Sequence, residues 1–347
     1  MEALASQSSL VALLVFIAGL GTLLFSAKYF VDGIAALAEA AGVPPLIVGM
    51  TVVAFGTSTP ELVVNSLAAW RGETALAFGN IVGSCTLNVG FVLAVTAIFK
   101  PMKVEPSLIT REVPMLWVAV AALLILASDR QLSGGVVAAD TFGRADGLVL
   151  LLLFGIFLYY TAIYSIARRA LTRGTATMPE DAFMAELSGD ATLPRLRPNL
   201  ARHALVAAAG LVGVSLGADW TVDGATSMAR VLGLSENLIG LTIVSFGTTL
   251  PELVTCILAA RRGNADIALG NVVGSNLFNI LAVGGIVSAI SPMTVPPGGH
   301  YDLWFMALLS VVLLPIAVRS GQTITRGEGV FLLLLYVAFL GWRLSGA

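Results

Sequence analysis

Long apolar segments recur along the whole chain and constrain its fold more than any other feature. A helix needs about 20 apolar residues to cross the roughly 30 Å hydrocarbon core of a bilayer. Because backbone polar groups inside a bilayer must be satisfied within each segment, the sequence predicts an all-α polytopic membrane protein. We expect ten transmembrane helices, near residues 9–30, 45–70, 75–99, 112–128, 145–167, 203–225, 237–260, 266–290, 302–318 and 328–344.

Composition and motifs exclude several other functions. Charged residues make up only 12% of the chain, about half of the share in a soluble domain. The net charge of −2 provides no basic surface for a nucleic-acid partner. The sequence shows neither a nucleophile–base pair nor a phosphate-binding loop, so we expect no enzymatic activity and no cofactor. Cys85 and Cys256 lie in apolar segments and are expected to serve in packing.

Lys and Arg residues are distributed unevenly between alternate loops. If the N-terminus lies outside, 13 of them fall in inside loops and 5 in outside loops. This bias predicts a multi-pass inner-membrane protein with both termini outside. The polar segment 168–202, which holds three prolines and both charge signs, is then a cytoplasmic linker. It separates an N-terminal five-helix half at 1–167 from a C-terminal five-helix half at 203–347.

A duplication relates the two halves. Residues 49–88 and 240–279 align without gaps at a constant offset of 191, and 22 of the 40 positions are identical. Because each half holds an odd number of helices, the second copy enters the membrane from the opposite side. Inverted repeats are typical of secondary transporters, which bind their substrates near the bilayer midplane where the halves meet. We therefore expect two inverted five-helix repeats.

Each copy carries the pattern F-G-T-[ST]-x-P-E-L-V in the middle of an apolar segment. The glutamates of this pattern, Glu61 and Glu252, are the only acidic residues deep inside these segments, and neither segment contains a Lys or Arg. A charge at the centre of a membrane helix costs roughly 2.5–3.5 kcal/mol on insertion scales. A bound cation or a proton is therefore the remaining partner for each carboxylate.

Other oxygen atoms surround the two glutamates. Pro60 lacks the N–H group that would bond to the carbonyl of Gly56, and Pro251 breaks the second copy in the same way. Carbonyls near Ala54 and Ser245 complete an all-oxygen set, which suits hard cations. Hydroxyl residues three and four positions before each glutamate share its helix face; they are Thr57, Ser58, Thr248 and Thr249.

The following helix of each copy carries a polar stripe. Its members are spaced by four residues and therefore share one helix face. They are Asn80, Ser84 and Asn88 in the first copy and Asn271, Ser275 and Asn279 in the second. The pattern G-x-x-x-G in both helices favours close approach of neighbouring helices. For Asn80 and Asn271, an interhelical contact and a ligand role are equally good interpretations.

The oxygen set suits Ca²⁺. This ion takes about 6–8 oxygen ligands, and two carboxylates supply several of them and neutralise its charge. Without Ca²⁺ the two like charges repel each other, so Na⁺ or protons compete for the same oxygens. Mutual exclusion on one site is what an antiporter requires.

These features resemble the α-repeats of the sodium/calcium exchanger superfamily, and especially its small bacterial members. The resemblance rests on the ten-helix layout, the two G-T-[ST]-x-P-E strings and the two G-N-x-x-G-S strings. It implies long gating helices, the first and the sixth, that slide across an eight-helix core. It also implies four clustered ion sites, three for Na⁺ and one for Ca²⁺. We expect the protein to function as a monomer in the lipid bilayer.

The resemblance also implies a set of ion ligands. Glu61 and Glu252 correspond to the shared central ligands. The other implied ligands are Thr57, Ser58, Thr248, Thr249, Ser84, Asn88, Ser275, Asn279 and the carbonyls of Ala54 and Ser245.

The sequence therefore favours exchange of Ca²⁺ for Na⁺. Exchangers that require K⁺ carry Asp where this chain has Asn279, so K⁺ dependence is not expected. Exchange of Ca²⁺ for H⁺ on the same site, and a cation channel, are the alternatives. Ion flux under swapped gradients distinguishes the three.

Overall fold

Helices form nearly all of the structure. The computed structural model describes residues 9–41, 45–72, 74–129, 134, 140–173, 200–231 and 245–345. The α-helices before residue 174 are α2 (Ser9–Ala41), α3 (Pro45–Val48), α4 (Ala54–Thr57), α5 (Thr59–Trp70), α6 (Thr74–Leu87), α7 (Ala94–Phe99), α8 (Val113–Leu126) and α10 (Arg144–Arg173). Those after residue 199 are α12 (Leu200–Val231), α14 (Ser245–Thr248), α15 (Leu250–Arg261), α16 (Ala265–Leu277), α17 (Gly284–Ile290), α18 (Gly299–Gln322) and α19 (Arg326–Leu344).

Short π-helical segments interrupt several of these helices. They are η1 (Gly49–Val53), η2 (Asn88–Leu93), η3 (Leu108–Glu112) and η5 (Phe278–Val283). A π-helix inserts one extra residue into a turn and is frequent at functional sites. A buried membrane helix is apolar on all its faces, so its hydrophobic residues show no helical periodicity. An inserted residue leaves no mark on the hydrophobic pattern. These segments are therefore not predictable from the hydrophobic pattern.

Seven helices in the described part of the chain are long and apolar enough to cross a membrane. They are Leu10–Ile34, Thr74–Phe99, Leu108–Leu126, Arg144–Tyr164, Leu200–Thr221, Ala265–Ile290 and Gly299–Arg319. The bent pair Leu46–Thr57 and Thr59–Trp70 makes an eighth if it is taken as one span. The prediction of an all-helical, multi-span protein is confirmed. Of the other expected spans, 237–260 begins outside the described residues and 328–344 lies in α19, so the count of ten stays a prediction.

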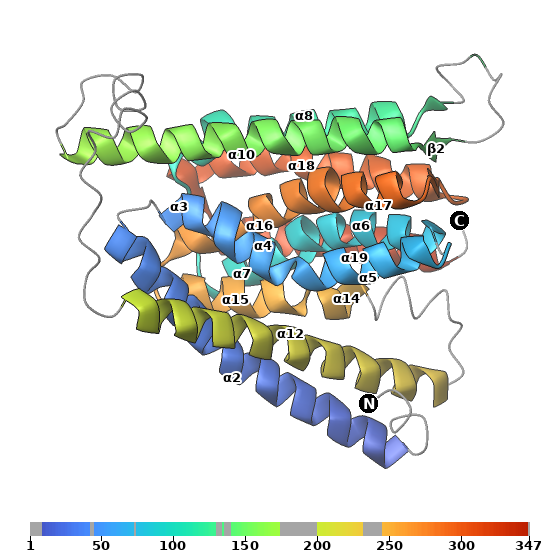
Figure 1. Cartoon of the computed structure of the whole chain (residues 1–347), viewed down its shortest axis with the longest axis horizontal. Helices are drawn as coiled ribbons and strands as arrows, with labels where there is room; N and C mark the ends of the chain where they lie inside the picture. The colour runs from blue at the N-terminus through green and yellow to red at the C-terminus, as the bar shows by residue number, and fades with distance from the viewer. Residues whose placement is uncertain are drawn as a thin grey trace.

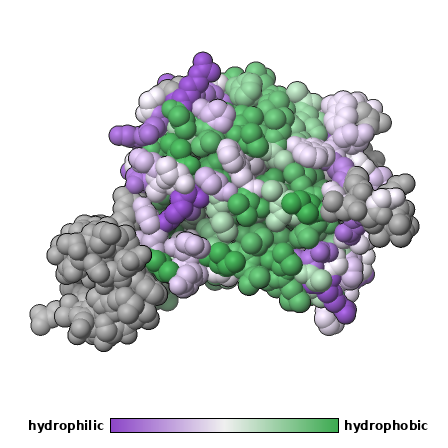
Figure 2. All heavy atoms as spheres, turned by 90° about the horizontal axis from the view of Figure 1, so that it is seen from above, coloured by the Kyte–Doolittle hydropathy of each residue, from purple (hydrophilic) through white to green (hydrophobic). Residues whose placement is uncertain are grey.

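Two of the spans form the centre of the bundle. In an apolar 18-residue stretch of Thr74–Phe99 and of Ala265–Ile290, 78% and 83% of the residues are buried, compared with 22% in such a stretch of Arg144–Tyr164. The outer face seen in Figure 2 carries a broad apolar band with polar residues on either side of it. Leu148 and Leu152 of α10 are exposed apolar side chains. Such a band is the surface that the hydrocarbon core of a bilayer covers.

Helices α2 and α12 form an inclined pair along one side of the bundle (Figure 1). They run antiparallel, because Gly224 faces Phe16 near one end of the pair and Gly33 faces Ala207 near the other. Glycines allow this close approach. A Cβ atom added to Gly210 would lie 2.5 Å from the backbone nitrogen of Phe30.

Segments from before residue 174 interlock with segments from after residue 199. Helix α10 packs against α17, where Gly147 faces the carbonyl of Gly285, and α19 packs against α7, where Gly329 faces the carbonyl of Ala94. Two short antiparallel sheets add further links. Strand β1 (Met102–Lys103) pairs with β4 (Thr323–Ile324), and β2 (Thr141–Phe142) pairs with β3 (Met293–Thr294). Each sheet therefore joins a loop from one part of the chain to a loop from the other.

The close packing of α2 on α12 leads to a stability prediction. We expect Gly210→Ala to destabilise the protein by about 1–3 kcal/mol, because the added methyl group meets the backbone of Phe30 rather than a movable side chain. Gly155→Ala on α10 is the matched control, since Gly155 is exposed and an added Cβ meets no described atom within 4 Å. Thermal unfolding of both variants in detergent measures the difference. Equal melting temperatures would contradict the role of this contact.

Candidate functional site

Breaks in two helices present the two buried glutamates. Helix α4 ends at Thr57, Ser58 forms a turn, and α5 starts at Thr59, with a bend of 41° between the helical segments on either side. Glu61 lies in the first turn of α5. In the second copy α14 and α15 are separated by Thr249, and Glu252 lies in the first turn of α15. The start of a helix is where its dipole stabilises a negative charge.

The two carboxylates are buried without a basic partner. The exposed fraction of Glu61 is 1% and that of Glu252 is 0%. Neither takes part in an ion pair within the described residues, and they lie close enough to repel each other. Both carboxylate oxygens of Glu61 and Oε2 of Glu252 accept no hydrogen bond there. A buried charge without a partner is costly, so these oxygens point to a bound cation.

Hydroxyl groups link the two copies across the site. The Ser58 hydroxyl donates to Oε1 of Glu252 at 2.9 Å, and the Ser275 hydroxyl lies 3.4 Å from the same oxygen. Ser58 lies on the span that carries Glu61, so one copy supports the carboxylate of the other. The site is therefore built jointly by both copies of the repeat.

The side-chain oxygens of Asn80 and Asn271 accept hydrogen bonds from further hydroxyl groups near the glutamates. The Thr57 hydroxyl donates to Oδ1 of Asn271 at 3.1 Å, and the Thr248 hydroxyl donates to Oδ1 of Asn80 at 3.4 Å. The Ser84 hydroxyl donates to the same Asn80 oxygen at 3.2 Å. Because protein donors occupy these amide oxygens, the structure favours the interhelical role for Asn80 and Asn271.

The amide nitrogens of the same asparagines have different partners in the two copies. Nδ2 of Asn80 donates to Oδ1 of Asn65 at 3.2 Å. Nδ2 of Asn271 instead donates to the sulfur of Cys256 at 3.3 Å. Asn65 and Cys256 are separated by the repeat offset of 191 and occupy the same place in each copy. Cys256 is therefore more than a packing residue, although packing was its only predicted role.

The backbone carbonyls predicted as ligands take part in the helix breaks. The carbonyl of Ala54 accepts from the N–H of Ser58 at 2.9 Å. The carbonyl of Ser245 accepts from the N–H of Thr249 at 3.2 Å and from the Thr249 hydroxyl at 2.9 Å. The Thr57 hydroxyl also lies 3.4 Å from the carbonyl of Ala54, and the Thr248 hydroxyl lies 3.2 Å from that of Ser245, so both carbonyls accept hydrogen bonds from their own helix breaks.

Asn88 and Asn279 lie at π-helical segments of the two central spans. Asn88 begins η2, and Asn279 is the second residue of η5. Both are 1% exposed. Oδ1 of Asn88 and both polar side-chain atoms of Asn279 have no hydrogen-bond partner in the described part of the chain. These amides therefore offer further buried oxygen atoms.

All twelve residues predicted for the site are buried, with exposed fractions of 5% or less. They are Ala54, Thr57, Ser58, Glu61, Ser84, Asn88, Ser245, Thr248, Thr249, Glu252, Ser275 and Asn279. The hydrogen bonds above connect many of them directly. Sequence reasoning missed the contacts made by Asn65, Cys256 and Asn276. The repeat offset aligns Asn65 with Cys256 and Cys85 with Asn276, but such a mismatch does not show what either residue contacts.

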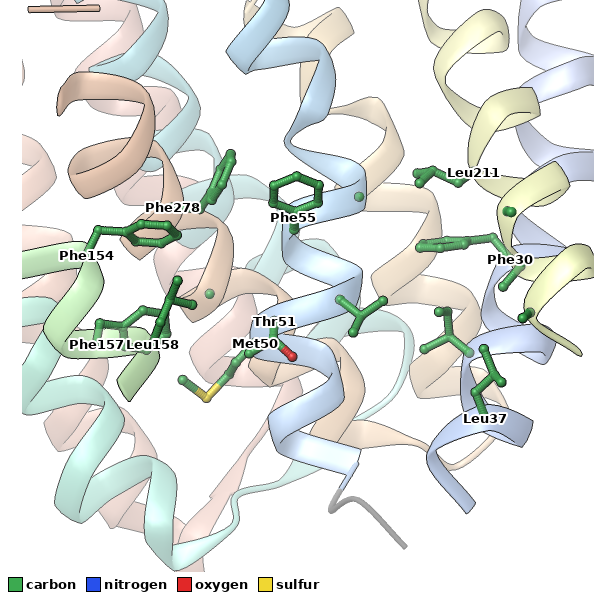
Figure 3. A pocket seen from close by; sticks show the side chains of 17 residues that line it. Phe30, Leu37, Met50, Thr51, Phe55, Phe154, Phe157, Leu158, Leu211 and Phe278 are labelled. Atoms are coloured by element: carbon green, nitrogen blue, oxygen red, sulfur yellow. The ribbon is translucent and has the colours of Figure 1, made fainter. Parts of the chain in front are cut away.

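An apolar groove of about 550 Å³ runs beside this polar site. Phe55 lies at its centre in Figure 3, with Phe278 on one side and Phe30 on the other. Thr51 provides the only polar side chain of its lining among the described residues, so the groove is not a cation site. Residues of α2 and α12 line it together with residues of η1, α4, α10, α16 and η5.

The chain is similar to known proteins over nearly its whole length. A sequence profile of the family described as sodium/calcium exchanger protein matches residues 11–163 and 202–345. Sodium/calcium exchanger MaX1 of Methanosarcina acetivorans is 32% identical over 342 residues, which cover 94% of this chain and 97% of the relative. Inner membrane protein YrbG of Escherichia coli is 35% identical over 338 residues, covering 96% and 98%.

Solved structures of the sodium-calcium exchanger NCX_Mj have the same fold. One of them, soaked with 10 mM Na⁺ and 10 mM Sr²⁺, matches with a TM-score of 0.78 at 28% sequence identity. The match covers 96% of this chain and 99% of that chain.

The contact between Ser58 and Glu252 leads to a binding prediction. We expect Ser58→Ala to weaken binding of a divalent cation about tenfold to a hundredfold, because a hydrogen bond to a charged group is worth roughly 1.5–3 kcal/mol. Equilibrium dialysis with ⁴⁵Ca²⁺ measures the affinity. Thr59→Ala is the matched control, since the hydroxyl of Thr59 bonds to the carbonyl of Phe55 in its own span. A similar loss in both variants would contradict a specific role for Ser58.

Proposed function

The chain belongs to the sodium/calcium exchanger protein family, and we propose that it exchanges Ca²⁺ for Na⁺ across the membrane by alternating access. This is a family of transporters rather than enzymes, and the ions are its substrates. One observation carries the proposal. Glu61 and Glu252, from equivalent helix breaks, lie buried together with three unpartnered carboxylate oxygens in the described structure.

The twelve residues named above are the proposed ion ligands. Two carboxylates neutralise one Ca²⁺, and the surrounding hydroxyls, amides and carbonyls provide neutral oxygens for its remaining coordination positions. The described residues contain no cluster of three or more His, Cys, Asp or Glu side chains, so the two carboxylates provide the whole charge of the site. Na⁺ prefers oxygen ligands as well. The two ions therefore compete for the same carboxylates, which couples their movements.

The proposed architecture has ten transmembrane helices in two inverted five-helix repeats. The halves span 1–167 and 203–347, with the linker 168–202 between them. Reciprocal contacts support the inversion, because Gly33 faces Ala207 and Gly224 faces Phe16. Gly224 lies 191 positions after Gly33, and Ala207 lies 191 positions after Phe16, so the two contacts are equivalent under the repeat. Such reciprocity is expected of elements related by a two-fold axis.

In the proposed localisation the protein lies in the inner membrane. Both termini lie outside, and the linker lies in the cytoplasm. The support for this orientation is the excess of Lys and Arg in the loops that it puts inside. We propose that the protein functions as a monomer, because one chain supplies both glutamates and all the side chains that support them.

Independence from K⁺ is also proposed. The support is that Asn88 and Asn279 are neutral amides, so the site has no third carboxylate to balance an additional monovalent ion. Protons are the alternative counter-ion, since a proton satisfies a buried carboxylate oxygen as well as Na⁺ does. That alternative is decided by the flux experiment.

Ion flux in proteoliposomes tests the proposed function. We expect an outward Na⁺ gradient to drive ⁴⁵Ca²⁺ uptake well above the level reached with K⁺ or choline inside the vesicles. Uptake that requires a pH gradient instead of the Na⁺ gradient would support exchange with H⁺. Ca²⁺ flux without any countertransported ion would support a channel.

Variants of the glutamates serve as controls in the same assay. Glu61→Gln and Glu252→Gln remove one negative charge each but keep the shape of the side chain, so we expect each to abolish exchange. Exchange at the wild-type rate in either variant would contradict a shared carboxylate site.

The groove in Figure 3 suits the sliding motion of the gating helices, α2 and α12. Ala208 of α12 lines this groove, so Ala208→Trp fills it with a large side chain. We expect this variant to reduce the exchange rate at least several-fold while Ca²⁺ binding persists, because the buried site itself is unchanged. Leu205→Trp is the matched control, since Leu205 lies on the same helix, is 71% exposed and does not line the groove. Equal rates in both variants would contradict a role of the groove in movement.

A further inference from the structure

Asn88 and Asn279 occupy equivalent positions, but their side chains have different surroundings. Nδ2 of Asn88 donates to Oδ1 of Asn276 at 3.0 Å, which leaves Oδ1 of Asn88 as its only unpartnered polar atom. Neither polar atom of the Asn279 side chain has a partner among the described residues. The same residue type is therefore held by a neighbour in one half of the chain and not in the other.

The difference arises from Asn276 and its equivalent, Cys85. These two residues face each other, each 1% exposed or less. Nδ2 of Asn276 donates to the backbone carbonyl of Cys85 at 3.2 Å, and the Cys85 sulfur lies 3.9 Å from the carbonyl of Asn276. Because its nitrogen is engaged in this way, the amide of Asn276 presents its oxygen to Asn88. A thiol is only a weak acceptor, so Cys85 provides no equivalent contact for Asn279.

The contact with Asn276 sets the orientation of the Asn88 amide. An amide has one acceptor end and one donor end, and a carbonyl neighbour accepts only from the donor end. The nitrogen of Asn88 is therefore fixed against Asn276, and the opposite end of the amide is an oxygen. This oxygen is buried and receives no hydrogen bond, which is the arrangement that a cation with oxygen ligands stabilises.

We propose that Asn276 is a positioning residue that holds Asn88 as an oxygen ligand for the transported cation, so that the two halves contribute unequal amide ligands. The proposal rests on the proposed function, because it takes Asn88 as part of the ion site. Asn88 is the preoriented amide. Asn279, which lacks such a partner, is the adaptable amide, able to turn either its oxygen or its nitrogen toward the site as the ions change.

Substitution of Asn276 by an apolar residue of similar size tests the proposal. We expect Asn276→Leu to raise the dissociation constant for ⁴⁵Ca²⁺ about threefold to tenfold in equilibrium dialysis, which is the effect of losing one buried hydrogen bond. In proteoliposomes the half-saturating Ca²⁺ concentration should rise by the same factor with little change in the maximal rate. Cys85→Ala is the matched control. It keeps the backbone carbonyl that binds Asn276, so we expect wild-type affinity.

A double-mutant cycle separates positioning from a general structural role. Asn276 acts through Asn88, so Asn276→Leu should cause no further loss of affinity when it is combined with Asn88→Ala. Additive losses in the double variant would overturn the proposal, and so would wild-type affinity in Asn276→Leu alone. Melting temperatures without Ca²⁺ report on folding. If the leucine variant does not fold, Asn276→Ala takes its place in the cycle with the same expectations.

The dialysis measurement also separates this proposal from the proposed function. Ca²⁺ binding by the wild-type protein without Na⁺-driven uptake would overturn Na⁺ exchange, while the affinities of the variants would still decide the role of Asn276. Normal exchange together with unchanged affinity in Asn276→Leu would overturn only the positioning role. Absence of Ca²⁺ binding by the wild-type protein would overturn both.

Discussion

The burial of two carboxylates without a basic partner is the constraint on which this structure depends. Glu61 and Glu252 lie at the starts of α5 and α15, where helix dipoles favour negative charge, and neither is exposed. Helix dipoles offset only part of the cost of burying two like charges next to each other. In the proposed function, a bound cation supplies the rest. The hydroxyls and amides around the pair follow from the same need, because they provide oxygen atoms inside an apolar bundle.

The site also explains why the two parts of the chain interlock. Ser58, from the span of Glu61, supports the carboxylate of Glu252, and Thr57 and Thr248 each bond to an asparagine of the other copy. Neither copy alone completes the site. The packing of α10 on α17 and of α19 on α7 ties the two parts of the chain together. The glycines between α2 and α12 let these helices pack closely on each other, and both helices also contact α15.

Sequence patterns predicted the candidate site because charges and prolines are conspicuous in apolar segments. Glu61 and Glu252 were predicted from their position and Thr57 and Ser58 from their helical spacing to Glu61. Ser84 and Ser275 were predicted from their spacing within the polar stripes of the following helices. The π-helical segments at Asn88 and Asn279 were not predicted, since no change in apolar pattern marks them. The role of Asn276 was also missed. Its equivalent in the first copy is Cys85, and a mismatch between copies shows a difference without showing what either residue contacts.

The sequence by itself determined an all-helical membrane protein with a duplicated carboxylate motif, because hydrophobic length and helical periodicity are local properties of the chain. The tertiary structure decided which oxygens stay free. Asn80 and Asn88 lie on one stripe with the same side chain, yet Asn80 is occupied by the hydroxyls of Ser84 and Thr248 and Asn88 keeps an unpartnered oxygen. That distinction depends on neighbours from distant segments, and only folding brings those segments together.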